Sequence, residues 1–318
     1  MRDLLFIGLC LFLIDCTGTV SNEENNPPAD PLHGFVIAGY LPDYRLTTIN
    51  QQIAKYLSDL IYFSVEPTSE GELDISRIYN NTYYILSQFR VVNPNLRILL
   101  AVGGWERSEG FAAMASTDSI RLKFIENLTR FCLDKHFTGA DYDWEFPANY
   151  TQNMAYQQLI IETKQSFARY GLLVTAALNS GQSLSSAAYS ALDRIHLMSY
   201  DHGGRHATYE DAVNDVQIFL NHQVPSSKIA LGMPFYGRGI TNFDLEMGYA
   251  EIVQYYHPAP DQDEVNGIYF NGIEMVKRKT LFALQDSLQG VMVWDLGQDT
   301  TDETSLLKAI YQVVIGNK

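Results

Sequence analysis

Apolar and polar positions follow two different rhythms along the chain, and these rhythms predict two kinds of element. Eight short stretches are apolar at nearly consecutive positions and rich in aliphatic and β-branched side chains. They are predicted strands, at residues 35–40, 60–65, 97–102, 139–144, 172–178, 195–199, 228–233 and 290–294. Strands that are apolar on both faces are typical of a parallel sheet covered by helices.

Between these strands the apolar side chains follow the helical period. In residues 119–136, Ile120, Phe124, Leu128 and Phe131 fall on one helix face. The same period predicts helices at residues 154–170, 210–221, 272–289 and 304–315. Strands and helices that alternate and close after eight units predict an α/β fold, a single (β/α)8 TIM barrel, which typically needs about 250 residues.

The longest interval between predicted strands covers residues 234–289. It leaves room for a short hairpin but not for a substantial inserted α+β domain. No linker, internal repeat or low-complexity stretch interrupts residues 33–318, so we expect one catalytic domain over this range. Without a large insertion beside it, a cleft on this barrel is expected to be shallow and open.

The first 32 residues have a different character. Arg2 precedes an apolar run over residues 4–14, which is too short to span a bilayer and is typical of a signal peptide. We therefore predict a signal peptide at residues 1–17 and a flexible polar tail at residues 18–32. Cys16 lies where a bacterial lipoprotein carries its lipid, so two locations remain open: secreted or extracellular, or lipid-anchored to a bacterial envelope. Cys132 would then have no intrachain disulfide partner.

Composition narrows the class of ligand. The formal net charge is −15, which argues against nucleic acid or an anionic membrane as a partner, since either needs a basic surface. A neutral polysaccharide fits better, because sugars are bound by stacking and hydrogen bonds, and the chain has 20 Tyr, 16 Phe and 3 Trp. We expect a monomer that needs no cofactor.

Unusual polar residues end the fourth predicted strand. The side-chain period of two places Asp141, Asp143 and Glu145 on the same face, which in a closed barrel points inward. Three carboxyls this close cannot all be ionised, so at least one pKa must rise, as a general acid for glycoside cleavage requires. An exposed edge strand and a divalent metal site are the alternative interpretations.

Five segments of the chain resemble motifs of glycoside hydrolase family 18, the chitinases and their relatives. TGADYDWEFP at residues 138–147 is similar to the family signature DxxDxDxE on the fourth strand. The other four are AVGGW at 101–105, LMSYD at 197–201, GMPFYGR at 232–238 and VMVWD at 291–295. Their order and spacing fit a barrel, and the resemblance extends over residues 35–315, in the short form without the inserted α+β domain.

The resemblance implies a retaining reaction in which the substrate supplies the nucleophile. Glu145 would protonate the glycosidic oxygen, and the acetamido carbonyl of the neighbouring sugar would attack the anomeric carbon. Asp143 would orient the acetamido N–H while sharing a proton with Asp141, and Tyr200 would hydrogen bond the acetamido oxygen.

The same resemblance implies a set of substrate-binding residues: Tyr40, Phe63, Trp105, Met198, Asp201, Tyr236, Arg238 and Trp294. Trp294 would form the floor beneath the distorted sugar, and Trp105 would lie on the leaving-group side. For Tyr40, Phe63 and Met198 a place in the barrel core is an equally good interpretation.

Two positions depart from the family pattern. Thr138 replaces the first Asp of the signature and Ala101 replaces the Ser of the third-strand motif. Both positions belong, by resemblance, to the hydrogen-bonded support under the central Asp, so we expect an altered pH optimum or a lowered rate. His196 is interpreted as a structural residue of its strand, and His202 is given no role.

The sequence thus predicts a chitinase-like glycosidase that cleaves β-1,4-linked N-acetylglucosamine in chitin or its oligosaccharides. Two alternatives stay open: an endo-β-N-acetylglucosaminidase acting on N-glycans, and a catalytically weak chitinase-like lectin. Glu145, which inactive relatives usually lack, favours an enzyme.

Overall fold

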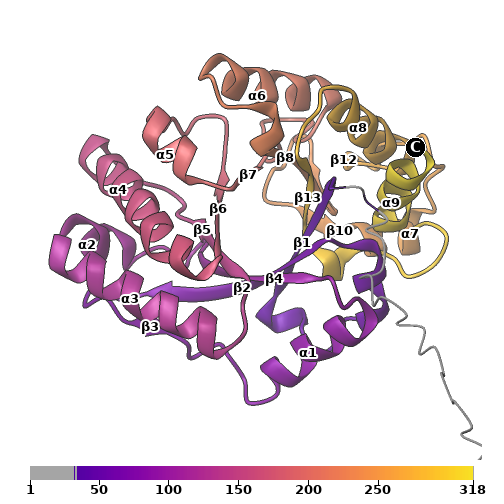
Figure 1. Cartoon of the computed structure of the whole chain (residues 1–318). Coiled ribbons are helices and arrows are strands. Elements are labelled where there is room, and N and C mark those ends of the chain that lie inside the picture. Colours follow the sequence, from indigo (N-terminus) through magenta and orange to yellow (C-terminus); the bar gives the residue numbers. More distant parts are fainter. Residues whose placement is uncertain (1–31, 33, 318) are drawn as a thin grey trace, which may run out of the picture. The chain divides into compact units, whose positions relative to one another are not determined.

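The computed structural model describes Leu32 and residues 34–317. Eight parallel strands in this part of the chain close into a barrel: β1 (Val36–Pro42), β2 (Asp59–Pro67), β4 (Arg97–Gly103), β5 (Gly139–Asp143), β6 (Leu173–Leu178), β7 (Arg194–Leu197), β8 (Ile229–Pro234) and β13 (Gly290–Trp294). The neighbours run β1-β13-β8-β7-β6-β5-β4-β2, and pairing of β1 with β2 completes the ring (Figure 1). The predicted TIM barrel is confirmed.

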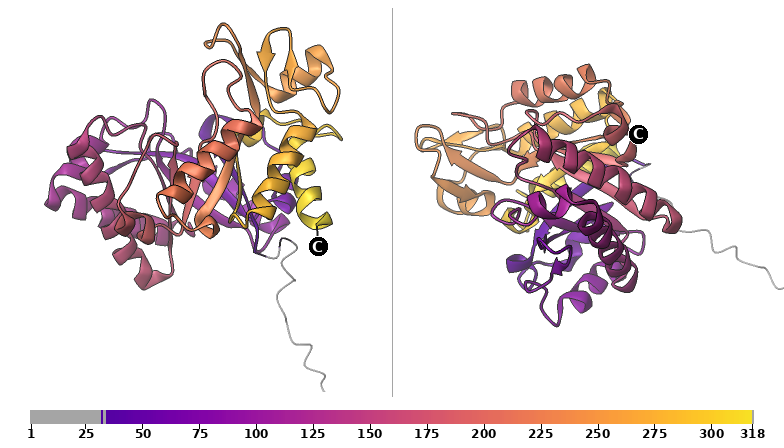
Figure 2. Two further views of the ribbon diagram at one scale, coloured as in Figure 1. Left: turned by 90° about the horizontal axis from the view of Figure 1, so that it is seen from above. Right: turned by 90° about the vertical axis from the view of Figure 1, so that its left-hand side faces the viewer.

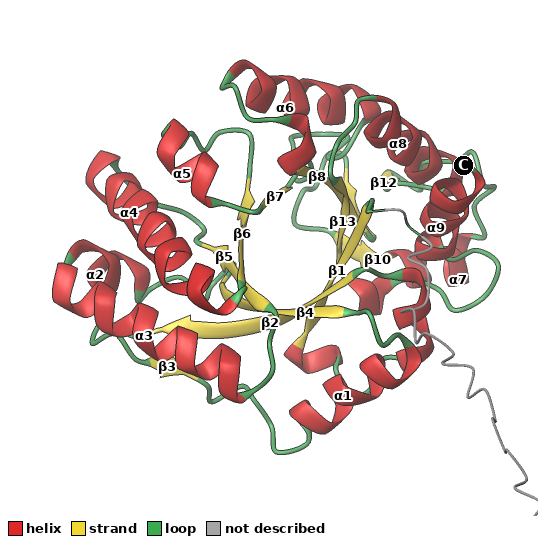
Figure 3. Ribbon diagram, in the orientation of Figure 1, coloured by secondary structure: helices red, strands yellow, loops and turns green. Residues whose placement is uncertain are grey.

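Helices surround the barrel strands (Figure 3). They are α1 (Thr82–Val92), α2 (Phe111–Ser116), α3 (Asp118–Asp134), α4 (Tyr150–Phe167), α5 (Ser186–Ala191), α6 (Tyr209–Asn221), α7 (Tyr249–Tyr256), α8 (Ile273–Gln285) and α9 (Leu306–Gly316). Polar caps define where several of them begin. Asn149 accepts a hydrogen bond from the backbone of Gln152 at the start of α4, and Thr208 forms a capping box with Asp211 at the start of α6.

The segment after β8 contains more structure than the short hairpin that the sequence allows. β9 (Tyr236–Gly239), β10 (Glu246–Gly248), β11 (Glu264–Val265) and β12 (Ile268–Tyr269) form a small antiparallel sheet in the order β10-β9-β12-β11. With α7 this sheet projects from the end of the barrel that is opposite the C-terminus (Figure 2). A further short strand, β3 (Leu73–Asp74), pairs with the end of β2.

The apolar core has two parts. The larger part packs the outward faces of the strands against the helices, and its members include Leu60, Ile98 and Val291. A smaller cluster fills the barrel interior with Ala38, Ile61, Leu99, Ala101, Ala230, Met292 and several aromatic side chains. Ala38, Ala101 and Ala230 leave room on the inner wall, where polar side chains from β5, β6 and β7 enter the barrel.

The predicted signal peptide, the lipid-anchor alternative at Cys16 and all of the predicted polar tail except Leu32 lie outside the described residues. Within residues 34–317, none of the helices is both long enough and apolar enough to cross a bilayer. Cys132 is a free, buried thiol.

Candidate active site

The predicted site residues gather at the carboxyl ends of the barrel strands, where the fold places catalytic groups. Tyr40, Phe63 and Trp294 lie on β1, β2 and β13. Asp141 and Asp143 lie on β5, and Glu145 follows two residues later. The loops after β4 and β7 carry Trp105, Met198, Tyr200 and Asp201, while β9 carries Tyr236 and Arg238.

The acids of β5 form a column whose exposure increases towards the carboxyl end. Asp141 is 0% exposed and Asp143 3%, whereas Glu145 is partly exposed. Burial, and then the neighbouring carboxyls of Glu145 and Asp141, raise the pKa of Asp143 well above its usual value. Burial also raises the pKa of Glu145 to about 7, although a hydrogen bond with Asp143 opposes the shift. The pair therefore retains a proton near neutral pH.

No cation offsets the charge of this pair. Within the described residues no Lys, Arg or His contributes to the pKa shift of Asp143 or Glu145, and Oδ1 of Asp143 has no hydrogen-bond partner. No group of three or more His, Cys, Asp or Glu side chains among residues 34–317 is arranged to hold a metal ion, so the metal-site interpretation has no support from the structure.

The loop after β4 fixes Glu145. The backbone N–H of Glu145 donates to Ser108 Oγ at 3.1 Å, and the backbone N–H of Trp105 donates to the Glu145 carboxyl. Gly104, with φ +112°, donates its N–H to the Asp143 carbonyl at 2.6 Å, and a Cβ at this position would overlap the ring of Phe63. The motifs AVGGW and TGADYDWEFP meet at this point because glycine readily adopts the positive φ of residue 104, which other residues rarely do.

Asp141 is held from below by three side chains. Tyr40 Oη donates to Oδ2 at 2.5 Å, Thr175 Oγ1 donates to Oδ1 at 2.5 Å, and His196 Nδ1 lies 2.9 Å from Oδ1. Thr138 does not belong to this support, contrary to what the resemblance implied. Its hydroxyl bonds to the backbone of Ile98, because position 138 lies at the amino end of β5 while Asp141 lies farther along the strand.

An aromatic floor lies beside the acids. The Trp294 ring centroid is 4.8 Å from that of Phe63 and 5.4 Å from that of Tyr40. Tyr40 is 1% exposed and Phe63 4%, whereas Trp294 remains partly exposed. Trp294 thus presents a face to the cleft, while Tyr40 and Phe63 support it from below. Trp105 is 67% exposed beside Glu145, where a sugar ring can stack on it.

A second polar group faces the acids from β7 and the small sheet. Asp201 accepts hydrogen bonds from Tyr236 Oη at 2.8 Å and from Arg238 Nε at 2.5 Å. Burial opposes ionisation of Asp201, but the hydrogen bonds with His206 and Arg238 outweigh it and lower the pKa to about 2. Burial and the nearby acids raise the pKa of Tyr200 well above its usual value, so its hydroxyl keeps its proton.

Sequence reasoning missed Ser108, Thr175 and His206 as members of the site, because each is a common residue type without a motif of its own. The sequence favours a structural role for His196, and the structure adds that its ring contacts Asp141. His202 bonds through Nε2 to Asp215, and Asp215 also accepts from Ser199. His202 therefore braces the loop after β7 and does not face the acids.

Comparisons with known proteins identify the family and the fold. The model for glycosyl hydrolases family 18 matches residues 36–299. Chitotriosidase-1 of Mus musculus is 30% identical, with 68% of this chain and 61% of the mouse protein covered. Probable chitinase 2 of Drosophila melanogaster is 26% identical over 65% of this chain and 57% of the fly protein. The chain thus spans about three fifths of the length of these relatives.

Among solved structures, a GH18 chitinase from the chitin utilization locus of Flavobacterium johnsoniae is 27% identical with a TM-score of 0.81, and the match covers 88% of this chain and 94% of that one. A chitinase from Bacteroides thetaiotaomicron shares the fold, with a TM-score of 0.79 at 23% identity, covering 88% of this chain and 96% of the other. Because the family model covers most of the chain, this protein belongs to family 18 of the glycosyl hydrolases.

Proposed function

We propose that this protein hydrolyses β-1,4 linkages between N-acetylglucosamine units, in chitin or its oligosaccharides, with Glu145 as general acid and then general base. The observation that carries the proposal is the pair of inward carboxyls without a cation. Burial raises the pKa of Glu145 to about 7, so a protonated carboxyl is available at the cleft near neutral pH. The names of the relatives, several of them chitinases, support the choice of substrate.

The nucleophile belongs to the substrate in this proposal. A retaining enzyme with two catalytic carboxylates needs the second one free to attack the anomeric carbon. Asp143 is 3% exposed and hydrogen-bonded to Glu145, and Asp201 is occupied by Tyr236 and Arg238. Burial also raises the pKa of Asp143, which disfavours its ionised, nucleophilic form, and the carboxylate of Asp201 is held by its partners; both observations favour attack by the acetamido carbonyl oxygen of the bound sugar.

The reaction then has two steps. Glu145 gives its proton to the glycosidic oxygen while the acetamido oxygen bonds to the anomeric carbon, so the leaving sugar departs and a cyclic oxazolinium forms. Glu145 next removes a proton from water as the water oxygen adds to the anomeric carbon, which restores the acetamido group with retention. Asp143 accepts from the acetamido N–H and Tyr200 donates to the acetamido oxygen during both steps.

The partly exposed Trp294 provides the surface on which the reacting sugar rests, and Trp105 provides a second stacking surface on the side of the leaving group. Asp201, kept ionised by its partners, accepts from hydroxyls of the distorted ring. The segment after β8 adds only the small sheet and α7, so we expect the site to admit the interior of a long sugar chain.

Product analysis tests the proposal. Purified protein is incubated with N-acetylglucosamine oligomers and, separately, with an N-glycosylated glycopeptide, and the products are separated by chromatography. Release of short oligomers from chitin oligomers alone supports the proposal, while cleavage of the glycopeptide core alone points to an endo-β-N-acetylglucosaminidase.

Oligomer binding without turnover over a broad pH range contradicts an enzymatic role and points to a lectin. A thiazoline mimic of the oxazolinium separates the two chemical schemes. It inhibits strongly if the substrate supplies the nucleophile, and fails to inhibit if a protein carboxylate does.

A further inference from the structure

The support of Asp141 is asymmetric between its two neighbouring strands. In the sheet register, Asp141 pairs with Ala101 of β4 on one side and with Thr175 of β6 on the other. Thr175 donates its hydroxyl to Oδ1 at 2.5 Å, but the methyl group of Ala101 can donate nothing. Asp141 is 0% exposed, so its remaining lone pairs need partners from within the barrel.

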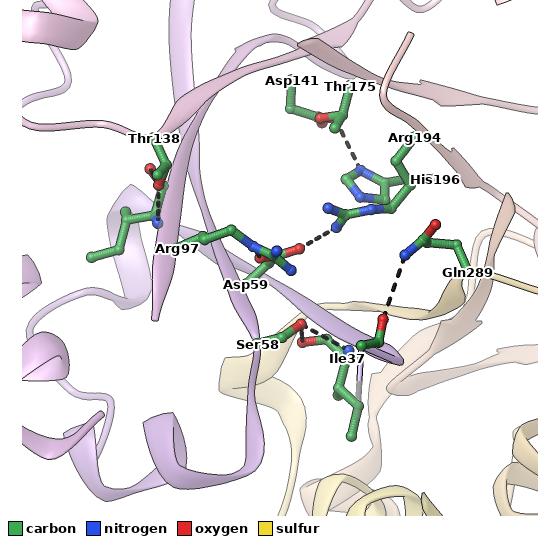
Figure 4. A network of polar contacts seen from close by, with 12 residues as sticks. Ile37, Ser58, Asp59, Arg97, Thr138, Asp141, Thr175, Arg194, His196 and Gln289 are labelled. Carbon is green, nitrogen blue, oxygen red and sulfur yellow. Dashed lines mark hydrogen bonds and ion pairs between the residues drawn. The ribbon is translucent and has the colours of Figure 1, made fainter. Parts of the chain in front are cut away.

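Those partners come from two strands that do not pair with β5, since His196 lies on β7 and Tyr40 on β1, and both side chains reach Asp141 inside the barrel. Figure 4 places His196 directly beside Asp141 and Thr175 in the barrel interior. His196 is 0% exposed, and its Nδ1 lies 2.9 Å from Asp141 Oδ1 and 3.2 Å from Tyr40 Oη. Its Nε2 is also buried and has no hydrogen-bond partner among the described residues.

The position of the imidazole proton follows from donor counting. Tyr40 has one hydroxyl proton and gives it to Asp141 Oδ2, so towards His196 its oxygen can only accept. The Asp141 carboxylate also only accepts. Both neighbours of Nδ1 are therefore acceptors, and Nδ1 must carry a proton.

The titratable and charged groups that face His196 come from three strands. Asp141 lies on β5 and Tyr40 on β1, while Arg194 lies two residues earlier on the same face of β7 and is ion-paired with Asp59 of β2. The register partners of His196 on β6 and β8 are Ala177 and Ala230, which carry no polar side-chain atoms. Asp141 is thus the only carboxylate in the described residues that His196 directly contacts.

We propose that His196 is a positioning residue for the hydrolysis, which holds the Asp141 carboxylate through Nδ1–H and replaces the hydroxyl that position 101 lacks. This inference rests on the proposed function. The neighbouring carboxyl of Asp141 raises the pKa of Asp143, and Asp143 in turn is hydrogen-bonded to Glu145. His196 therefore acts on the acid catalyst through two carboxyls and does not touch the substrate.

The test uses three single variants and one double variant of the full chain. His196→Leu keeps the branched shape but loses the donor, and we expect kcat to fall about tenfold to a hundredfold, the cost of one hydrogen bond to a charged group, with KM nearly unchanged. His196→Asn can place an amide N–H where Nδ1 stood, and we expect kcat to stay within about threefold of wild type, since the hydrogen bond is kept.

The decisive variant adds Ala101→Ser to His196→Leu. Position 101 is the register partner of Asp141, so we expect its hydroxyl to recover about tenfold in kcat relative to His196→Leu, and to give a smaller gain as the single variant Ala101→Ser, where His196 already donates. A purely structural role for His196 predicts no recovery, because the two positions lie on different strands. Thermal unfolding of each variant shows which rate changes come from a damaged fold.

A second measurement does not depend on turnover. Long-range ¹⁵N–¹H NMR spectra of the wild-type protein are expected to show a proton on Nδ1 of His196, with a shift of that signal in Asp141→Asn. A neutral ring protonated only on Nε2 overturns the inference even in an active enzyme. Absence of chitin-oligomer hydrolysis by wild type, with the expected NMR signal present, instead counts against the proposed function alone.

Discussion

Two buried acidic sites occupy opposite ends of the same barrel, and they are treated in opposite ways. At the amino ends of the strands, Asp59 of β2 is ion-paired with Arg97 of β4 and Arg194 of β7 (Figure 4). At the carboxyl ends, Asp143 and Glu145 are hydrogen-bonded to each other, and no cation of residues 34–317 contributes to their pKa shifts. Burial alone would raise the pKa of Asp59, but the guanidinium groups of Arg194 and Arg97 outweigh it and lower that pKa.

The contrast teaches that burial by itself does not decide what a carboxyl does. Desolvation is the first cause in both places, and the counter-charge determines whether the carboxyl stays ionised or keeps a proton. Asp59 therefore stays ionised and links β2 to β4 and β7 through its ion pairs. Glu145 instead keeps a proton that it can exchange near neutral pH. Because Arg97 and Arg194 lie only at the amino ends of the strands, that end stabilises the fold, while the carboxyl end keeps carboxyls that can react.

The largest effect is expected at the reactive end. Glu145→Gln keeps the size and hydrogen bonding of the side chain but removes the exchangeable proton, so kcat on chitin oligomers should fall by about 10²- to 10⁴-fold. Binding of the oligomer, measured by calorimetry, should persist. If kcat fell only a few-fold, Glu145 would not be the acid, and the carboxyl end of the barrel would not be the reactive end.

A change of comparable size, in the free energy of unfolding, is expected at the amino ends of the strands, where Asp59 lies. Arg194→Met leaves Asp59 buried with only the partly exposed Arg97, so the free energy of unfolding should drop by about 3–5 kcal/mol. Chemical denaturation at pH 7 measures the change. An unchanged denaturation midpoint would mean that the ion pairs do not stabilise the barrel and that the two ends differ less than proposed.

The pH profile gives a third, smaller difference. Because Glu145 must be protonated to act as an acid and its pKa is about 7, kcat/KM should fall about tenfold per unit above that pH. A raised carboxyl pKa favours the folded state below the unfolded pKa, and this contribution is lost as the pH rises through about 7. Glu145→Gln should therefore gain thermal stability relative to wild type at pH 8 but not at pH 4. An equal difference at both pH values would contradict the shift.

The smallest effect is expected where an ion pair lies in water. Arg130 and Glu126 pair on the exposed face of α3, one helical turn apart, with side chains that are 61% and 73% exposed. Arg130→Ala should change the free energy of unfolding by about 0–0.5 kcal/mol. Measured beside Arg194→Met, this variant is the matched control that separates buried from exposed pairing. A loss as large as that of Arg194→Met would show that arginine removal is costly wherever it occurs.

The fold was largely predictable because its signals are local. All eight barrel strands appear within two residues of the predicted positions, since a buried parallel strand is apolar throughout. The helix predicted from residue 154 begins at Tyr150, where the Asn149 cap sets its start. The helices α1, α2, α5 and α7 and the small sheet after β8 were not predicted. Of these, α2, α5 and α7 have only six to eight residues, which leaves too few turns for the helical period to be recognised.

The site was predictable only where side chains follow each other on one strand. Asp141, Asp143 and Glu145 share a face by simple alternation, so their grouping needed no structure. His196 lies 55 residues from Asp141 and Thr175 lies 34 from it, and only closure of the barrel brings them together. Ser108 likewise reaches Glu145 through a loop whose path depends on Gly103 and Gly104.

The pair Asp143 and Glu145 also makes mutation in one direction easier than in the other during evolution. A neutral side chain of similar size at position 145 removes a desolvated charge, so above about pH 7 we expect it to stabilise the fold. The reverse mutation must be accepted against stability. A duplicated copy free from selection for turnover would therefore drift readily towards a sugar-binding barrel without catalysis, and would seldom return.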